Sequence, residues 1–114
     1  APIMAVGPDT AIPIGLIVTE AVGSALNRAR ESSIVPEIRI EAADRDGTVE
    51  LVIEDDGPGP DRMIGPGARG GFGLTLIRGL AMQLGGEARI LVRDGAGMRV
   101  VVTFPMPQDA DAHD

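Results

Sequence analysis

Hydrophobic residues at helical spacing predict a helix over residues 11–30. Asp9 or Thr10 can cap this helix, and Pro13 is tolerated in a first turn because no N–H is needed there. The stripe that we expect to be buried consists of Ile14, Val18, Val22, Ala25 and Ala29. The opposite stripe is small and polar, has Arg28 beside it, and consists of Glu20, Ser24, Asn27 and Glu31. This polar stripe is either a solvated helix face or a surface against which another group lies closely.

Alternation of apolar and polar residues predicts strands over residues 36–43, 48–55, 88–92 and 98–104, with at best an edge strand near residues 2–6. Asp46-Gly47 predicts a tight hairpin turn with positive φ between the first two of these strands. The spaced aspartates of this turn do not make a calcium loop, because the other ligands of such a loop are absent.

A second helix is predicted from Phe72 or Gly73 to Leu84, where Gly85-Gly86 ends it. Residues 60–70 are dense in Gly and Pro and predict a mobile loop before this helix. The order helix, hairpin, loop, helix, hairpin predicts an α/β two-layer sandwich, a mostly antiparallel mixed sheet covered on one face by helices. We expect residues 1–107 to form one domain and residues 108–114 to form a disordered acidic tail.

Composition narrows the class of protein and partner. The 114 residues carry a net charge of −7 with a pI near 4.5, which argues against nucleic acid and anionic membranes as partners. The sequence has no cysteine, so disulfides and thiolate zinc sites are excluded. Because no apolar run approaches the length of a membrane span and no signal pattern opens the chain, we expect a cytoplasmic domain without membrane contact.

Two glycine clusters carry the candidate chemistry. Asp55-Asp56-Gly57-Pro58-Gly59 follows an apolar strand, and Gly70-Gly71-Phe72-Gly73-Leu74 opens the second helix. A carboxylate at a strand end suits a ligand amine, and a glycine turn at a helix N-terminus presents free N–H groups to phosphate. The pattern therefore indicates a nucleotide, with its base near Asp55 and its phosphates near Gly71 and Gly73.

Two other nucleotide motifs are excluded. Residues 65–70 spell G-x-G-x-x-G, but the dinucleotide fingerprint requires a strand directly before it, and the strand ends earlier here. The sequence also contains no Gly-Lys-Ser/Thr, which removes a P-loop.

Three segments resemble, in the right order, the boxes of the GHKL ATPase superfamily. Residues 14–29 resemble its N box, residues 52–59 its G1 box (D-N-G-x-G) and residues 71–74 its G2 box. Residues 73–86 and 97–105 are most similar to the ATP-binding domains of bacterial sensor histidine kinases, in the HWE/HisKA_2-like branch with short lids. The resemblance spans about residues 10–105 and implies the Bergerat fold, which agrees with the order of elements above.

The resemblance implies roles for the residues at these positions. Asp55 would accept from the adenine amino group, and Gly57 and Gly59 would let the main chain pass close to the base. Glu20 would orient or deprotonate the incoming nucleophile, which makes it the catalytic candidate. The candidates for holding the phosphates and Mg²⁺ of ATP are Ser24, Asn27, Arg28, Arg69, Gly71, Phe72, Gly73 and Leu74. Among these, Ser24 together with Glu20 forms the candidate Mg²⁺ ligand set.

Simpler structural alternatives stay open for the charged candidates. Asp55 can instead initiate a turn, and Glu20 can be a helix carboxylate that pairs with Arg28 or with solvent. Arg28 and Arg69 can be solvated arginines on a helix face and in a loop.

Three positions depart from the family pattern. Ser24 stands where the N box carries an asparagine that helps to hold Mg²⁺, and Asn27 is a candidate substitute. Met98 stands where a threonine usually supports the adenine-binding aspartate, and methionine makes no such hydrogen bond. Asp56 replaces the usual asparagine and adds a negative charge.

We therefore expect this chain to be the ATP-binding catalytic module of a two-component sensor histidine kinase. Such a module positions Mg·ATP for phosphoryl transfer to a histidine on a separate dimerisation domain, with a response regulator downstream. The acceptor is not His113, which lies in a polar tail. The alternative is a degenerate Bergerat-fold interaction module with weak or no nucleotide binding, similar to a pseudokinase or a histidine phosphotransferase. A third interpretation is an anti-sigma-factor serine kinase, which the segment 83–86 resembles less.

Overall fold

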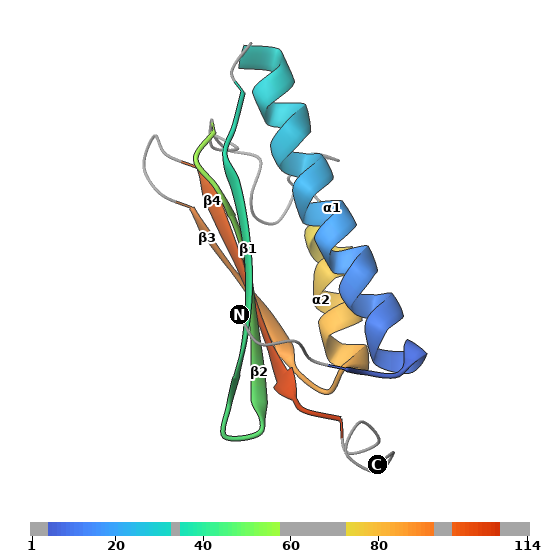
Figure 1. The fold of residues 1–114 in the computed structure, drawn as a ribbon. Helices are drawn as coiled ribbons and strands as arrows, with labels where there is room; N and C mark the ends of the chain where they lie inside the picture. The colour runs from blue at the N-terminus through green and yellow to red at the C-terminus, as the bar shows by residue number, and fades with distance from the viewer. Residues whose placement is uncertain (1–4, 33–34, 58–72, 93–96, 108–114) are drawn as a thin grey trace.

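A computed structural model describes residues 5–32, 35–57, 73–92 and 97–107 of the chain. The elements follow the predicted order: α1 (Pro8–Ser32), β1 (Ile38–Arg45), β2 (Thr48–Asp55), α2 (Leu74–Gln83), β3 (Glu87–Val92) and β4 (Met98–Pro105). The strands form one antiparallel sheet in the order β1-β2-β4-β3, and both helices lie on the same side of it (Figure 1). The predicted α/β two-layer sandwich is thus confirmed. The predicted tail lies outside the described residues.

The hairpin between β1 and β2 forms as the sequence predicts. Asp46 and Gly47 have φ values of 55° and 85°, so both central residues of the turn are left-handed, as a type I′ turn requires. The Asp44 carboxylate Oδ1 also accepts from the Gly47 N–H at 3.1 Å. At the N-terminus, Ala5 and Val6 belong to no strand, so the described part of the expected edge strand is absent.

Helix α1 is longer than predicted at both ends. It begins at Pro8, and the Gly7 carbonyl accepts from the N–H groups of Thr10 and Ala11 at 3.1 and 2.9 Å. Proline suits a first helical position because its missing N–H would have no partner there. The prediction that Asp9 or Thr10 caps the helix is therefore wrong, and Pro13 lies past the first turn instead of within it.

The buried side of α1 is rotated relative to the predicted stripe. Ile17 and Ala21 are 0% and 5% exposed, whereas the predicted Ile14, Val18 and Val22 are only half-buried at the edge of the core. Ala25 and Ala29 are buried as predicted. Small residues on the buried side allow the helix to lie close to its neighbours, and hydrophobic spacing alone does not select this side, because the helix is apolar around much of its circumference.

The same helix corrects the expectation about membrane-length runs. Pro8–Asn27 is long and apolar enough to cross a membrane by length and composition, with a mean hydropathy of 1.3. The expectation that no run approaches that length is wrong on these two criteria. In the fold, Ile17 and Ala21 of this segment belong to the hydrophobic core cluster, so part of its apolar surface packs inside the protein.

Helix α2 ends in a Schellman motif. The Gly85 N–H donates to the Met82 carbonyl and the Gly86 N–H to the Ala81 carbonyl, both at 2.9 Å. Gly85 has φ of 81°, which favours glycine and confirms the predicted stop. Ile77 and Ala81 of α2 are fully buried. They complete a core with the helix-facing residues of β2 and β4, which are Val49, Leu51, Ile53, Met98, Val100, Val102 and Phe104.

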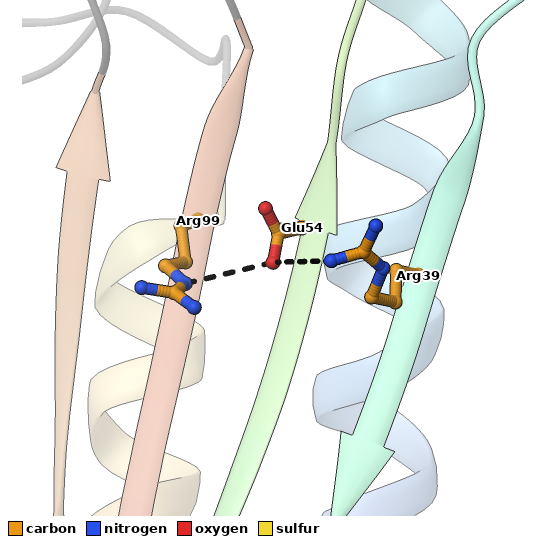
Figure 2. Close-up of polar contacts among 3 residues, drawn as sticks. All are labelled: Arg39, Glu54 and Arg99. Carbon is orange, nitrogen blue, oxygen red and sulfur yellow. Dashed lines mark ion pairs between the residues drawn. The ribbon is translucent and has the colours of Figure 1, made fainter.

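The opposite face of the sheet carries an ion-pair network (Figure 2). Glu54 Oε1 lies 3.7 Å from Arg39 Nη1 and 3.6 Å from Arg99 Nε, and the Glu54 side chain is only 13% exposed. These residues occupy one row of the sheet, since Glu54 pairs in register with Arg39 on β1 and with Arg99 on β4. The network therefore links three strands one residue before the end of β2.

Candidate functional site

Asp55 ends β2 on the face of the sheet that the helices cover. Its side chain follows the alternation of Val49, Leu51 and Ile53, which are all buried on that face. The half-buried Asp55 carboxylate accepts from the Gly57 N–H through Oδ1 at 3.0 Å. This contact across two residues fixes the orientation of the carboxylate at the strand end.

The main chain approaches Asp55 closely from β4. Gly97 has φ of 66°, and a Cβ atom built on it would overlap the Asp55 carbonyl oxygen and lie 2.8 Å from the carbonyl carbon. Any residue with a side chain would therefore push the strands apart as well as adopt a strained backbone. The sequence alone shows Gly97 only as one residue of the segment that resembles histidine kinases. Its close approach to the Asp55 carbonyl follows from the pairing of β2 with β4.

Met98 lies directly opposite Asp55 in the register of β2 and β4. It is 3% exposed and belongs to the core cluster. At this position its buried side chain packs in the core beside the end of β2.

Glu20 and Gly73 are brought together from the two helices. Gly73 is the N-cap of α2 and supplies no side-chain cap, and a Cβ built on it would lie 2.5 Å from Glu20 Cδ and 2.6 Å from Cγ. The half-buried Glu20 side chain thus lies against the start of α2, where the helix dipole favours negative charge. The first N–H groups of α2 have no acceptor within the helix, so this end also suits a phosphate.

Ser24 lies one turn beyond Glu20 on α1 and is only 5% exposed. Its Oγ has no hydrogen-bond partner among the residues that the structure describes. A buried hydroxyl without a partner costs about 1–3 kcal/mol, so the position suits a polar ligand that supplies the missing bond. The alternative of a solvated face is wrong for Ser24.

Asn27, the candidate substitute for the missing metal ligand, does not lie buried beside Ser24. It is exposed, and its Oδ1 accepts from Arg30 Nη2 at 2.9 Å. An amide oxygen already bonded to an arginine at the surface is a poor substitute for a metal ligand one turn earlier. The remaining candidates fall outside what the structure describes: Gly59, Arg69, Gly71 and Phe72 as whole residues, and Arg28 and Leu74 in their side chains.

The described candidates share one side of the fold. Asp55 and the Glu20–Gly73 contact both lie on the helix-covered side of the sheet, and the end of β2 and the start of α2 both point toward the upper end of Figure 1. Among the described candidates on this side, Asp55 and Glu20 are carboxylates, whereas Arg39 and Arg99, in the row next to Asp55, face the other way (Figure 2). An anionic ligand here depends on main-chain N–H groups or a cation.

A model of a known family matches most of the chain. The family model described as "Histidine kinase-, DNA gyrase B-, and HSP90-like ATPase" matches residues 9–108. The matched range contains every described candidate residue named above.

Two curated relatives are sensor proteins. The chain is 33% identical to the nitrate/nitrite sensor protein NarX of Escherichia coli K12 over 95 residues, which cover 82% of this chain and 15% of NarX. It is 29% identical to the sensor protein NarQ homolog of Haemophilus influenzae over 104 residues, which cover 91% of this chain and 18% of that protein. The chain thus spans less than a fifth of these relatives.

The fold is also found among solved structures. The histidine kinase domain of the blue-light activated histidine kinase EL346 of Erythrobacter litoralis superposes with a TM-score of 0.80 at 27% identity, covering 97% of this chain and 54% of that one. A second structure of the same kinase gives a TM-score of 0.74 at 24% identity, covering 93% of this chain and 33% of that one, and supports the fold alone.

Proposed function

The chain belongs to the family of histidine kinase-, DNA gyrase B- and HSP90-like ATPases, and on that premise we propose that it is the ATP-binding catalytic module of a two-component sensor histidine kinase. The observation that carries the proposal is the setting of Asp55. A carboxylate at the end of a core strand is oriented by the Gly57 N–H and backed by Gly97. This arrangement suits recognition of an adenine amino group by a fixed acceptor. The assignment to the short-lid branch remains a prediction.

The phosphates would lie at the start of α2. In this proposal the main-chain N–H groups at Gly73 and Leu74, together with Gly71 and Phe72, hold phosphate oxygens. Arg69 and Arg28 supply positive charge, and Gly59 with Gly57 lets the main chain pass the base. Glu20 of α1, whose side chain lies against the start of α2, orients the nucleophile or accepts its proton, which makes it the proposed catalytic residue.

Magnesium fits this side of the fold only together with the nucleotide. No group of three or more His, Asp or Glu side chains that could hold a metal is present in the described part of the chain. Glu20 and the Ser24 hydroxyl, which has no partner among the described residues, offer two oxygens one helical turn apart. Mg²⁺ in proteins is often held by one or two protein oxygens plus substrate phosphates. When bound, the ion would neutralise phosphate charge that the acidic neighbourhood otherwise repels.

The proposed reaction also requires a phosphoacceptor histidine on a separate domain. We propose that the phosphoryl group passes to a histidine on a dimerisation domain, in the same chain or another one, and then to a response regulator. The proposed location is the cytoplasm, and no nucleic-acid or membrane contact by this domain is proposed.

A degenerate interaction module remains the second candidate, because Ser24 and Met98 replace family residues on this side of the fold. A measurement of thermal stability with added nucleotide distinguishes the ATP-binding module from the degenerate module. The domain is titrated with Mg·ATP and with Mg-free ADP, and nucleotide at a hundredfold excess over its Kd should stabilise the fold by about 2.7 kcal/mol. The absence of any shift with either nucleotide at millimolar concentration would reject ATP binding and favour the degenerate module.

A further inference from the structure

A pair of hydrogen bonds joins the start of β1 to the residue after β2. The Asp56 N–H donates to the Glu37 carbonyl at 3.2 Å, and the Glu37 N–H donates to the Asp56 carboxylate Oδ1 at 2.7 Å. Ile38 pairs with Asp55 in register, so Glu37 and Asp56 form the next row beyond the sheet. We call this contact the Asp56–Glu37 pair.

The pair ends the ladder in an unusual way. In an antiparallel row of this type, each residue donates its N–H to the other residue's main-chain carbonyl. Here the Asp56 carboxylate takes the place of its own carbonyl as the acceptor for the Glu37 N–H. The main chain after Asp56 is therefore released from β1 and can turn away at Gly57.

Gly57, the residue after Asp56, packs closely on Pro36, the residue before Glu37. A Cβ built on the buried Gly57 would lie 3.3 Å from Pro36 Cβ and 3.5 Å from Asp55 Oδ1. The Gly57 N–H is also the donor that orients the Asp55 carboxylate, at 3.0 Å. Displacement of the chain at Asp56 would thus move Gly57 and change the orientation of Asp55.

We propose that Asp56 is a positioning residue for nucleotide recognition: its carboxylate, bonded to the Glu37 N–H, places Gly57 and thereby holds Asp55 toward the base. This inference rests on the proposed function. It also gives a role to the aspartate that stands where the family carries an asparagine: the added negative charge faces the main-chain N–H of Glu37, the residue before β1. An asparagine has the same acceptor atom, so the charge is not essential to the contact.

The test compares three variants of the domain. Asp56→Ala removes the acceptor, and Asp56→Asn keeps it. Asp44→Ala is the matched control, because Asp44 Oδ1 accepts from the Gly47 N–H at 3.1 Å at the other end of the same hairpin. For each variant, Mg·ATP and Mg·GTP affinities are measured by calorimetry well below the melting temperature, and unfolding is measured separately.

We expect Asp56→Ala to weaken Mg·ATP binding about tenfold and to lower the ratio of ATP to GTP affinity, since Asp55 contacts the base edge. Asp56→Asn should stay within about threefold of the wild type. Asp44→Ala should lower the melting temperature as much as Asp56→Ala without changing either affinity. Amide exchange at Glu37 should accelerate in Asp56→Ala alone.

Three outcomes would overturn the positioning role alone, given a wild type that binds ATP. They are an Asp56→Ala variant with unchanged affinity, an Asp56→Asn variant as weak as Asp56→Ala, and an Asp44→Ala variant that loses the same affinity. A wild-type domain without ATP binding would instead reject the proposed function, and the positioning role with it.

Discussion

The Gly73 main chain and the Glu20 side chain are in such close contact that no side chain fits between them. Glu20 comes from the middle of α1 and Gly73 from the N-cap of α2, so the contact joins the two helices at the proposed phosphate end. The glycine leaves room for the Glu20 side chain in this position, and it is not needed for its backbone conformation, because its φ of −76° suits any residue.

Substitution of Gly73 by alanine should therefore destabilise the fold by about 1 kcal/mol, the low end for overpacking, because the end of the flexible Glu20 side chain can move aside. Gly79 is the matched control, because it is exposed on the same helix and a Cβ added to it would meet nothing within 4 Å. Gly79→Ala should stabilise the domain by up to about 1 kcal/mol through helix propensity. Urea unfolding measures the stability of both variants. Adding Glu20→Ala to Gly73→Ala should restore the stability that Gly73→Ala loses. Equal effects of the two glycine substitutions would contradict the contact.

Gly97→Ala should be more damaging than another substitution of a left-handed glycine. Gly47 also has positive φ, but nothing lies within 4 Å of its Cβ position, so Gly47→Ala introduces only backbone strain of about 1–2 kcal/mol. Gly97→Ala adds overlap with the Asp55 carbonyl, and we expect at least about 2 kcal/mol more. Denaturant midpoints of the two variants decide this, and equal midpoints would show that the overlap relaxes freely.

Removal of the Ser24 hydroxyl should have opposite effects on stability and on metal-dependent binding. Ser24→Ala deletes a buried hydroxyl without a described partner, so the free domain should gain up to about 1 kcal/mol of unfolding free energy. The same variant should bind Mg·ATP more weakly relative to Mg-free ADP. A loss of stability in the free domain would show that the hydroxyl already has a partner.

Ser24→Asn restores the residue that the family carries at this position. It should tighten Mg·ATP binding more than Mg-free ADP binding, because only the former includes the ion. Calorimetric titration of both nucleotides checks this. Equal changes for the two nucleotides would remove the metal from this position.

Asp55→Asn should weaken ATP binding in preference to GTP binding. The substitution replaces an acceptor with a group that also donates, and hydrogen bonds to charged groups contribute about 1.5–3 kcal/mol, so a loss of tenfold or more is expected for ATP. Asp46→Asn, in the exposed hairpin turn, serves as the control. An unchanged ratio of ATP to GTP affinity would show that Asp55 does not contact the base.

Glu54→Gln tests the ion pairs on the outer face. Because Glu54 is largely buried between Arg39 and Arg99, we expect a loss of about 1 kcal/mol, at the upper end for such pairs. Glu50→Gln on the same strand removes a single, more exposed pair with Arg45 and should change stability by less than about 0.5 kcal/mol. Thermal unfolding of both variants measures the losses, and a loss for Glu54→Gln no larger than that for Glu50→Gln would contradict the contribution assigned to the Glu54 pairs.

Local patterns in the sequence were sufficient to predict the order of the helices and strands that the structure describes. The alternation in β2 and β4, the Asp46-Gly47 turn and the stop at Gly85 are set by φ/ψ preferences and side-chain periods within a few residues. The same holds for the position of Asp55 at a strand end. The helix stripe was misplaced, because α1 is apolar on more than one side and only docking selects which side is buried.

Tertiary structure alone decided the contacts that define the candidate site. Glu20 meets Gly73, Gly97 lies on the Asp55 carbonyl, and Asp56 bonds to Glu37, in each case between residues that lie far apart in the sequence. No periodicity encodes such contacts, because they depend on how strands register and how closely helices approach. The sequence determined which residues are available for a nucleotide, and the packing of the sheet against the helices determined how they are held.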